Sequence, residues 1–159
     1  LKDKSFMART FVCCTFEDLS LRDLYDCMRL RQEVFVVEQT CAYLDADGLD
    51  QASHHILMRD ETNSLIGYAR IVPKGLSYDD YCAIGRVATD IKVRRNGYGK
   101  ELMKFTLLRC EELFPETPIK ISAQVYVLNF YKDLGFCTTG DEYLEDDIPH
   151  IGMLYNSSS

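Results

Sequence analysis

The sequence predicts an α/β domain, in which helices flank a mixed β-sheet and one domain spans residues 1–159. The first observation behind this is the alternation of short β-rich runs with windows of helical periodicity. The second is that internal repeats, low-complexity tracts and Pro/Gly-rich linkers are absent, so no domain boundary is indicated. The third is an ordinary globular composition, with 47% hydrophobic and 27% charged residues, on a chain long enough to bury a substantial core.

The first elements are a strand and a helical segment. Residues 10–16 are rich in β-formers and predict a strand. Asp18 or Ser20 can cap the helix that follows, in which apolar residues recur at helical spacing. Residues 33–38 continue either as helix or as extended chain, and periodicity does not decide between the two.

A hairpin and a third strand come next. Residues 54–59 and 65–72 both have strand character, and the polar residues 60–64 make a turn between them, so an antiparallel hairpin is predicted. Residues 81–88 predict the strand that follows.

The second half alternates helices and strands. A helix is expected from near Gly97 to about Leu113, because Pro115 cannot continue it. Gly135 is placed to end a second, short helix. The remaining segments are a strand over 119–124, the short helix over 127–134, a strand that begins at 136–138 and a last strand over 150–155.

The acidic loop at residues 41–52 resembles a calcium loop at first sight. An EF-hand with Gly48 at its sixth position would place Tyr43 at the first and His54 at the twelfth, where carboxylates are required. We therefore predict no metal site there.

Composition excludes several classes of function. The net charge of −7 argues against a nucleic-acid partner, since phosphate backbones require a basic face. No apolar run approaches the ~18 residues of a membrane span, and residues 1–6, which we leave out of the fold prediction, lack the apolar core of a signal peptide. The seven cysteines are odd in number and none are spaced C-x-x-C, so we expect neither disulfides nor zinc, a cytoplasmic location, and core positions for most of them.

The most informative segment is the loop that opens the helix at Gly97. Gly97 and Gly99 let a ligand approach the backbone, and the helix N-terminus offers N–H donors and partial positive charge to a pyrophosphate. Arg94, Arg95 and Lys100 add charge. Neither the Walker pattern nor the third glycine of the dinucleotide fingerprint is present. The alternative is a helix start that merely uses glycines and surface arginines.

A second cluster covers residues 124–136. If the short helix packs beside the strand before it, Tyr131 can face a cleft between splayed strands. It could then protonate the thiolate that leaves a thioester, and Asn129 could hydrogen-bond the amides of a pantetheine arm. The alternative is that Phe130 and Tyr131 are an ordinary core aromatic pair.

Two of these segments resemble motifs of the GNAT superfamily of acetyltransferases. Residues 94–99 resemble its Q/R-x-x-G-x-G/A acyl-CoA motif, and residues 129–136 resemble its second motif, with the tyrosine and the closing Gly-Phe. More specific likeness, to the ElaA-like branch, lies at residues 31–39, 45–50, 55–57, 84–87 and 148–153. The resemblance runs from about residue 16 to 153 and implies a mixed sheet splayed between its fourth and fifth strands, with acyl-CoA in the gap.

The resemblance also implies roles for named residues. Main-chain groups of Val87, Ala88 and Thr89 should pair with pantetheine, and Asn129 and Tyr131 keep the roles given above. The pyrophosphate should be held by the amides of Arg94, Arg95, Asn96, Gly97, Tyr98, Gly99 and Lys100. The cosubstrate is then acetyl-CoA, without a metal. The acceptor is an amine on a small molecule or a protein, attacked directly in a ternary complex, and homodimers are common among such domains.

The general base is left open by the sequence. Many GNAT enzymes have a glutamate on the fourth strand, where this chain has Arg86, which cannot accept a proton at neutral pH. Candidates are His55, His150, Glu38 and the carboxylates of residues 142–147. Arg86 can pair with a buried carboxylate or with one on the substrate, and we expect Arg86 and Gln124 to contact the acceptor. The rival functions are a non-catalytic acyl-CoA-binding module and a structural interaction domain.

Overall fold

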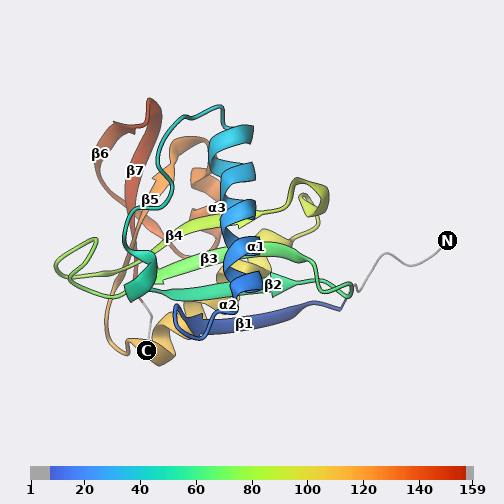
Figure 1. Ribbon diagram of the computed structural model, residues 1–159. Helices are drawn as coiled ribbons and strands as arrows, with labels where there is room; N and C mark the ends of the chain where they lie inside the picture. Colours follow the sequence, from blue (N-terminus) through green and yellow to red (C-terminus); the bar gives the residue numbers. More distant parts are fainter. Residues whose placement is uncertain (1–7, 157–159) are drawn as a thin grey trace.

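A computed structural model describes residues 8–156 of the chain; residues 1–6, set aside above, lie outside this range. Within it, seven strands form one mixed sheet in the order β1-β2-β3-β4-β5-β7-β6, with helices on both faces (Figure 1). The strands are β1 (Thr10–Thr15), β2 (His54–Arg59), β3 (Leu65–Val72), β4 (Cys82–Thr89), β5 (Ile119–Gln124), β6 (Cys137–Glu145) and β7 (Ile148–Tyr155).

The helices connect these strands. Two of them, α1 and α2, cover opposite faces of the first half of the sheet (Figure 1). The helical elements are α1 (Leu21–Arg31), the π-helix η1 (Gln32–Glu38), α2 (Tyr98–Leu113), α3 (Leu128–Asp133) and the short 3-10 helices η2 (Asp50–Ala52), η3 (Ile91–Val93) and η4 (Val125–Val127).

Strand alternation divides the core between the two faces. On β2, Ile56 and Met58 pack toward α2, whereas Leu57 between them packs toward α1. Successive strand residues point to opposite faces, so a strand covered on both sides becomes a continuous apolar run. Full burial of each such side chain contributes roughly 1.5–3 kcal/mol.

The predicted elements are confirmed to within about two residues at their ends. Ser20, rather than Asp18, caps α1: its Oγ accepts from the Asp23 amide at 3.0 Å, and the Asp23 carboxylate accepts from the Ser20 amide at 3.3 Å. The segment that periodicity left open is helical, as η1.

Most of the cysteines occupy buried or partly buried core positions, as predicted. Cys27, Cys82 and Cys110 are buried, and Cys13 and Cys14 pack partly buried against the core. All seven are free thiols. None of the helices within residues 8–156 combines the length and the apolar character that a membrane span needs.

Candidate functional site

The sheet opens between β4 and β5. These two parallel strands pair only at Cys82–Ile119 and Ala83–Lys120, near their starts, and then diverge. Among residues 8–156, the edge of β4 from Ile84 to Thr89 therefore has no strand partner on the β5 side. This edge offers main-chain groups to a ligand, apart from the Thr89 carbonyl, which accepts from Arg94. This divergence is the splay that the resemblance implies, and Val87, Ala88 and Thr89 lie along it.

The N-terminus of α2 lies beside the splay. Gly97, with a φ of +79°, is the N-cap residue and supplies no side-chain cap. Among residues 8–156, no group accepts a hydrogen bond from the backbone amides of residues 95–100. The Asn96 side chain instead donates to the carbonyls of Val93 and Arg94, at 3.0 and 3.1 Å. A helix end with unpaired amides and a positive dipole binds anions such as phosphate.

The two arginines of the loop differ in their surroundings. Arg94 donates to the Thr89 carbonyl at 3.0 Å and forms an ion pair with Glu38 at the end of η1. The Arg94 hydrogen bond lowers the pKa of Glu38. Arg95 and Lys100 are exposed, and within the described part of the chain neither makes an ion pair, so their charge is available to a ligand.

Tyr98 and Gly99 are the first two residues of α2, and the Tyr98 side chain and the Cβ position of Gly99 both meet other parts of the chain. The Arg9 guanidinium lies over the Tyr98 ring at 4.4 Å, and a Cβ at Gly99 would contact the Phe130 ring at 3.7 Å. At these positions the backbone amides are therefore the groups that face a ligand.

Tyr131 lies on α3, the short helix that follows β5. Its ring packs edge-on against Phe130 and Phe136, as in the alternative of a core aromatic pair. No residue of 8–156 hydrogen-bonds its hydroxyl, however, and burial raises its pKa to about 12. Asn129, on the same helix, is exposed. The phenol thus stays protonated at neutral pH and has an unused donor.

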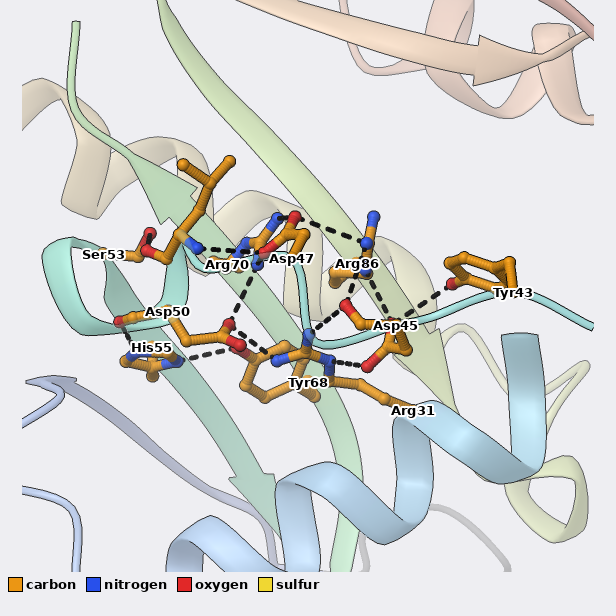
Figure 2. Close-up of polar contacts among 11 residues, drawn as sticks. Arg31, Tyr43, Asp45, Asp47, Asp50, Ser53, His55, Tyr68, Arg70 and Arg86 are labelled. Atoms are coloured by element: carbon orange, nitrogen blue, oxygen red, sulfur yellow. Dashed lines mark hydrogen bonds and ion pairs between the residues drawn. The ribbon is translucent and has the colours of Figure 1, made fainter. Parts of the chain in front are cut away.

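Arg86 lies at a kink of β4 and contacts the acidic loop. Its φ of +52° accompanies a register shift in the pairing of β3 with β4. Its Nε donates to the Asp45 carboxylate at 2.8 Å, and its guanidinium lies over the Tyr43 ring (Figure 2). Arg86 thus pairs with a buried carboxylate, one of the two kinds of partner expected for it.

The acidic loop forms a largely buried ion-pair network with three arginines. Arg31 binds Asp45 and Asp50, both at 2.8 Å, and Arg70 binds Asp47 at 2.7 Å and Asp50 at 2.9 Å (Figure 2). Partial burial pushes the pKa of Asp47 upward, but the hydrogen bond from Arg70 and the other donors outweigh it and lower it to about 2. Three arginines and three aspartates thus compensate one another.

Of the candidate bases, His55 is the most enclosed. Its Nε2 lies 2.9 Å from the Asp50 carbonyl, which can only accept, so Nε2 carries the proton and Nδ1 accepts from the Tyr68 hydroxyl at 2.7 Å. Burial lowers its pKa. Both ring nitrogens are therefore occupied (Figure 2).

The other candidates lie closer to the splay. Glu38 is engaged by Arg94, which makes it a poorer base. Gln124, at the end of β5, donates to Gln39 at 3.3 Å. His150, on β7, pairs in register with Gln124, one strand from the splay. Its Nδ1 lies 2.6 Å from the Ile148 carbonyl and its Nε2 lies 3.4 Å from Glu145.

The sequence did not indicate two residues beside His150, nor the arginine partners of the acidic loop. Ser122 and Tyr143 hydrogen-bond one another beside His150, and strand alternation was the signal that could have placed them on one face. Arg70 stands within the otherwise apolar run 65–72, which is itself a signal of buried pairing, whereas Arg31 comes two residues after Arg29 and directly before Gln32 and gives no such signal.

Comparison with known proteins covers most of the chain. The family described as "Acetyltransferase (GNAT) domain" matches residues 25–156. Protein ElaA from Escherichia coli is 41% identical over 140 residues, covering 86% of this chain and 89% of its own. A UPF0039 protein of Schizosaccharomyces pombe is 39% identical over 144 residues, covering 90% of this chain and 94% of its own.

Solved structures match in the same way. An acyl-CoA N-acyltransferase from Pseudomonas aeruginosa superposes with a TM-score of 0.87 at 38% identity, covering 93% of this chain and 99% of its own. The crystal structure of Escherichia coli ElaA also gives a TM-score of 0.87, at 36% identity, over 94% of this chain and all of its own (100%). An aminoglycoside 6'-N-acetyltransferase complexed with coenzyme A shares the fold, with a TM-score of 0.68 at 14% identity over 91% of this chain and 96% of its own.

Proposed function

Because the chain belongs to the GNAT acetyltransferase family, we propose that it transfers an acetyl group from acetyl-CoA to an amine by direct attack in a ternary complex. The observation that carries the proposal is the row of unpaired amides over residues 95–100, at the N-terminus of α2 and beside the splay. These amides are placed for the pyrophosphate, with Arg95 and Lys100 as its cations.

The rest of the cofactor follows the splay. The open edge of β4, with Val87, Ala88 and Thr89, is the main-chain partner that we assign to the pantetheine arm, together with Asn129 from α3. The thioester then comes near Tyr131. A thiol, with a pKa of ~8.5, is a stronger acid than this phenol, so Tyr131 chiefly stabilises the departing thiolate by a hydrogen bond.

Calorimetric titration with acetyl-CoA tests the proposal. The variant Arg95→Ala/Lys100→Ala removes both exposed cations, and we expect it to weaken binding about 10- to 30-fold, at about 1 kcal/mol for each contact. Arg94 is left in place because its replacement would also release Glu38.

Lys104→Ala is the matched control, an exposed lysine one turn further along α2. We expect it to bind like the unaltered protein. If the unaltered protein bound no acetyl-CoA, the proposal would be wrong and only the fold would remain.

A non-catalytic acyl-CoA-binding module is the second candidate. It is favoured by Arg86, a residue without base character and held by Asp45, at the kink of β4. The two functions share the cofactor site and differ in turnover, so replacement of Tyr131 distinguishes them.

A further inference from the structure

A polar cluster lies on strands β5, β6 and β7, on the same face of the sheet as α1 and outside the proposed cofactor site. On β5, Ile121 and Ala123 pack into the core with α2, so Ser122 and Gln124 point to the opposite face. The hydrogen bond of Gln124 to Gln39, directly after η1, places that face on the side of α1.

The turn between β6 and β7 fixes which side chains join this face. Asp146 and Asp147 both have positive φ, 50° and 62°, as in a two-residue hairpin turn. The register then pairs Glu145 with Ile148 and Tyr143 with His150. Tyr143 and Glu145, two residues apart on β6, therefore lie on one face, and His150 lies on the same face because it is opposite Tyr143 on β7.

The protonation of His150 follows from its partners. The Ile148 carbonyl only accepts, so Nδ1 carries the proton that it donates across 2.6 Å. In the neutral ring Nε2 then has a lone pair, and it faces the Glu145 carboxylate at 3.4 Å. Two acceptors thus lie side by side without a hydrogen between them, and a cationic N–H donor from outside would satisfy both.

Glu145 is held in this position from β5. The Ser122 hydroxyl donates to Glu145 at 3.2 Å, so Tyr143 must donate to Ser122. The side chain of Glu145 is 54% exposed and that of His150 is 9% exposed, so an incoming molecule can reach the carboxylate while the imidazole is held in place. The Tyr143 and His150 rings are stacked at 6.1 Å.

The charged groups around His150 leave the site suited to a cation. Glu145 is the charged neighbour from β6, and Gln124, opposite on β5, is neutral. Lys120 lies on the same face of β5 but places its Nζ over the Tyr78 ring at 4.8 Å. Arg86, at the splay, is held by Asp45.

We propose that this cluster of Ser122, Tyr143, Glu145 and His150 is the acceptor site, which takes a primary amine as its ammonium ion on Glu145 and passes its proton to Nε2 of His150. The inference rests on the proposed function. It places the base beside the splay, because His150 pairs with Gln124 and neighbouring strands lie about 5 Å apart. Glu145 contacts the substrate: it binds and positions the ammonium ion beside Nε2 of His150.

The reaction balances with these groups. Nε2 of His150 takes one proton from the ammonium, and the free amine attacks the thioester carbonyl to form the C–N bond. As the C–S bond breaks, the nitrogen of the tetrahedral intermediate gives up its second proton and the sulfur takes up one proton in its place, so that coenzyme A leaves as the thiol. The products are the N-acetylamine, coenzyme A thiol and the proton on His150.

The pH dependence of turnover tests the inference, with acetyl-CoA and 1,5-diaminopentane as substrates. For His150→Gln we expect kcat/KM to fall about 100-fold at pH 7, the range of general-base catalysis. The loss should shrink to below about 10-fold near pH 10, where much of the amine has lost its proton unaided. A purely structural defect would persist at every pH.

Glu145→Gln tests the positioning role. The replacement takes away the anion that binds the ammonium ion, so the KM for the amine should rise about 5-fold while kcat changes less than about twofold. Alanine, whose carboxylate would approach Glu145, should be a poorer acceptor than the diamine. Glu17→Gln, the same replacement at an exposed glutamate outside β5–β7, should leave kcat and the KM for the amine unchanged.

Each outcome decides one claim. Both variants must first match the unaltered protein in acetyl-CoA affinity, measured by calorimetry, and in thermal unfolding. A pH-independent loss in His150→Gln, or an unchanged KM for the amine in Glu145→Gln, overturns the inference while the proposed function stands. If the unaltered protein acetylates none of the amines, the proposed function fails for this class. The site is then decided by NMR titration of His150 with 1,5-diaminopentane: shifts abolished in Glu145→Gln support it, and their absence overturns it.

Discussion

At the scale of single residues, the phenol of Tyr131 separates catalysis from cofactor binding. Tyr131→Phe keeps the ring packing against Phe130 and Phe136 and removes only the hydroxyl. We expect kcat to fall about 100-fold in steady-state assays, because hydrogen-bond donation to the leaving sulfur is lost. Acetyl-CoA affinity should change less than twofold.

Tyr155→Phe is the corresponding control, since Tyr155 belongs to the same aromatic cluster through Phe136. Equal turnover of Tyr131→Phe and the unaltered protein would remove the phenol from the mechanism. Loss of cofactor binding in Tyr131→Phe would instead indicate a role in holding acetyl-CoA.

Residue types point to the proposed cofactor half of the site more directly than to the proposed acceptor half. The glycines and cations of residues 94–100 are adjacent in sequence, so their spacing carries the signal. The cluster of Ser122, Tyr143 and His150 comes from three strands and exists only once the register is set. For the same reason Arg86 could be identified as an unusual residue, but its partner, about forty residues away on another segment, could not.

At the scale of elements, the β6–β7 turn is built from residues that tolerate positive φ without being glycine. Asp147 has a φ of +62°, a conformation that glycine adopts at lower cost than aspartate. We expect Asp147→Gly to raise the free energy of unfolding by about 0.5–1 kcal/mol in urea denaturation.

Asp147→Ala removes the same carboxylate but keeps a Cβ. It should be neutral or destabilising, because alanine adopts positive φ less readily than aspartate. If both variants changed stability alike, the charge of Asp147 would be responsible, and not the backbone conformation.

Strands, hairpin and helices were largely predictable, since each has a local signal: alternation for β2, a polar turn before β3, Gly97 ahead of α2. The segment over 33–38 was not, because Val and Phe suit a strand as well as a buried helix. Its helical form is set by tertiary contacts, with Val34 buried under α1's side of the sheet and Glu38 bound to Arg94.

At the scale of the whole molecule, the carboxylates that bind arginines make the fold sensitive to acid. The pKa values of Asp47, Asp50, Asp23 and Glu38 are all lowered in the folded chain, that of Asp47 to about 2. Each of these groups contributes stability that is present above its unfolded pKa, near 4, and is lost as the pH falls through its folded pKa. Urea unfolding should therefore give a stability that declines steeply from pH 4 toward pH 2.

Asp47→Asn separates this contribution from general acid effects. The variant should be less stable by roughly 1–2 kcal/mol at pH 7, a value reduced for the partial exposure of Asp47, and its decline below pH 4 should be shallower. A decline of unchanged depth would show that other carboxylates govern the acid transition.

The last residue of η1 and the residue after it reach to both sides of the splay. Glu38 binds Arg94, which follows β4, and Gln39 accepts from Gln124 at the end of β5. The end of η1 thus contacts residues next to both strands. In the proposed complex, acetyl-CoA that enters between β4 and β5 must shift this end of η1, and the chain that follows it leads to Asp45. The kinetic consequence is an order of events: we expect acetyl-CoA to bind first and the amine second, because the first ligand sets the gap that the second must reach across.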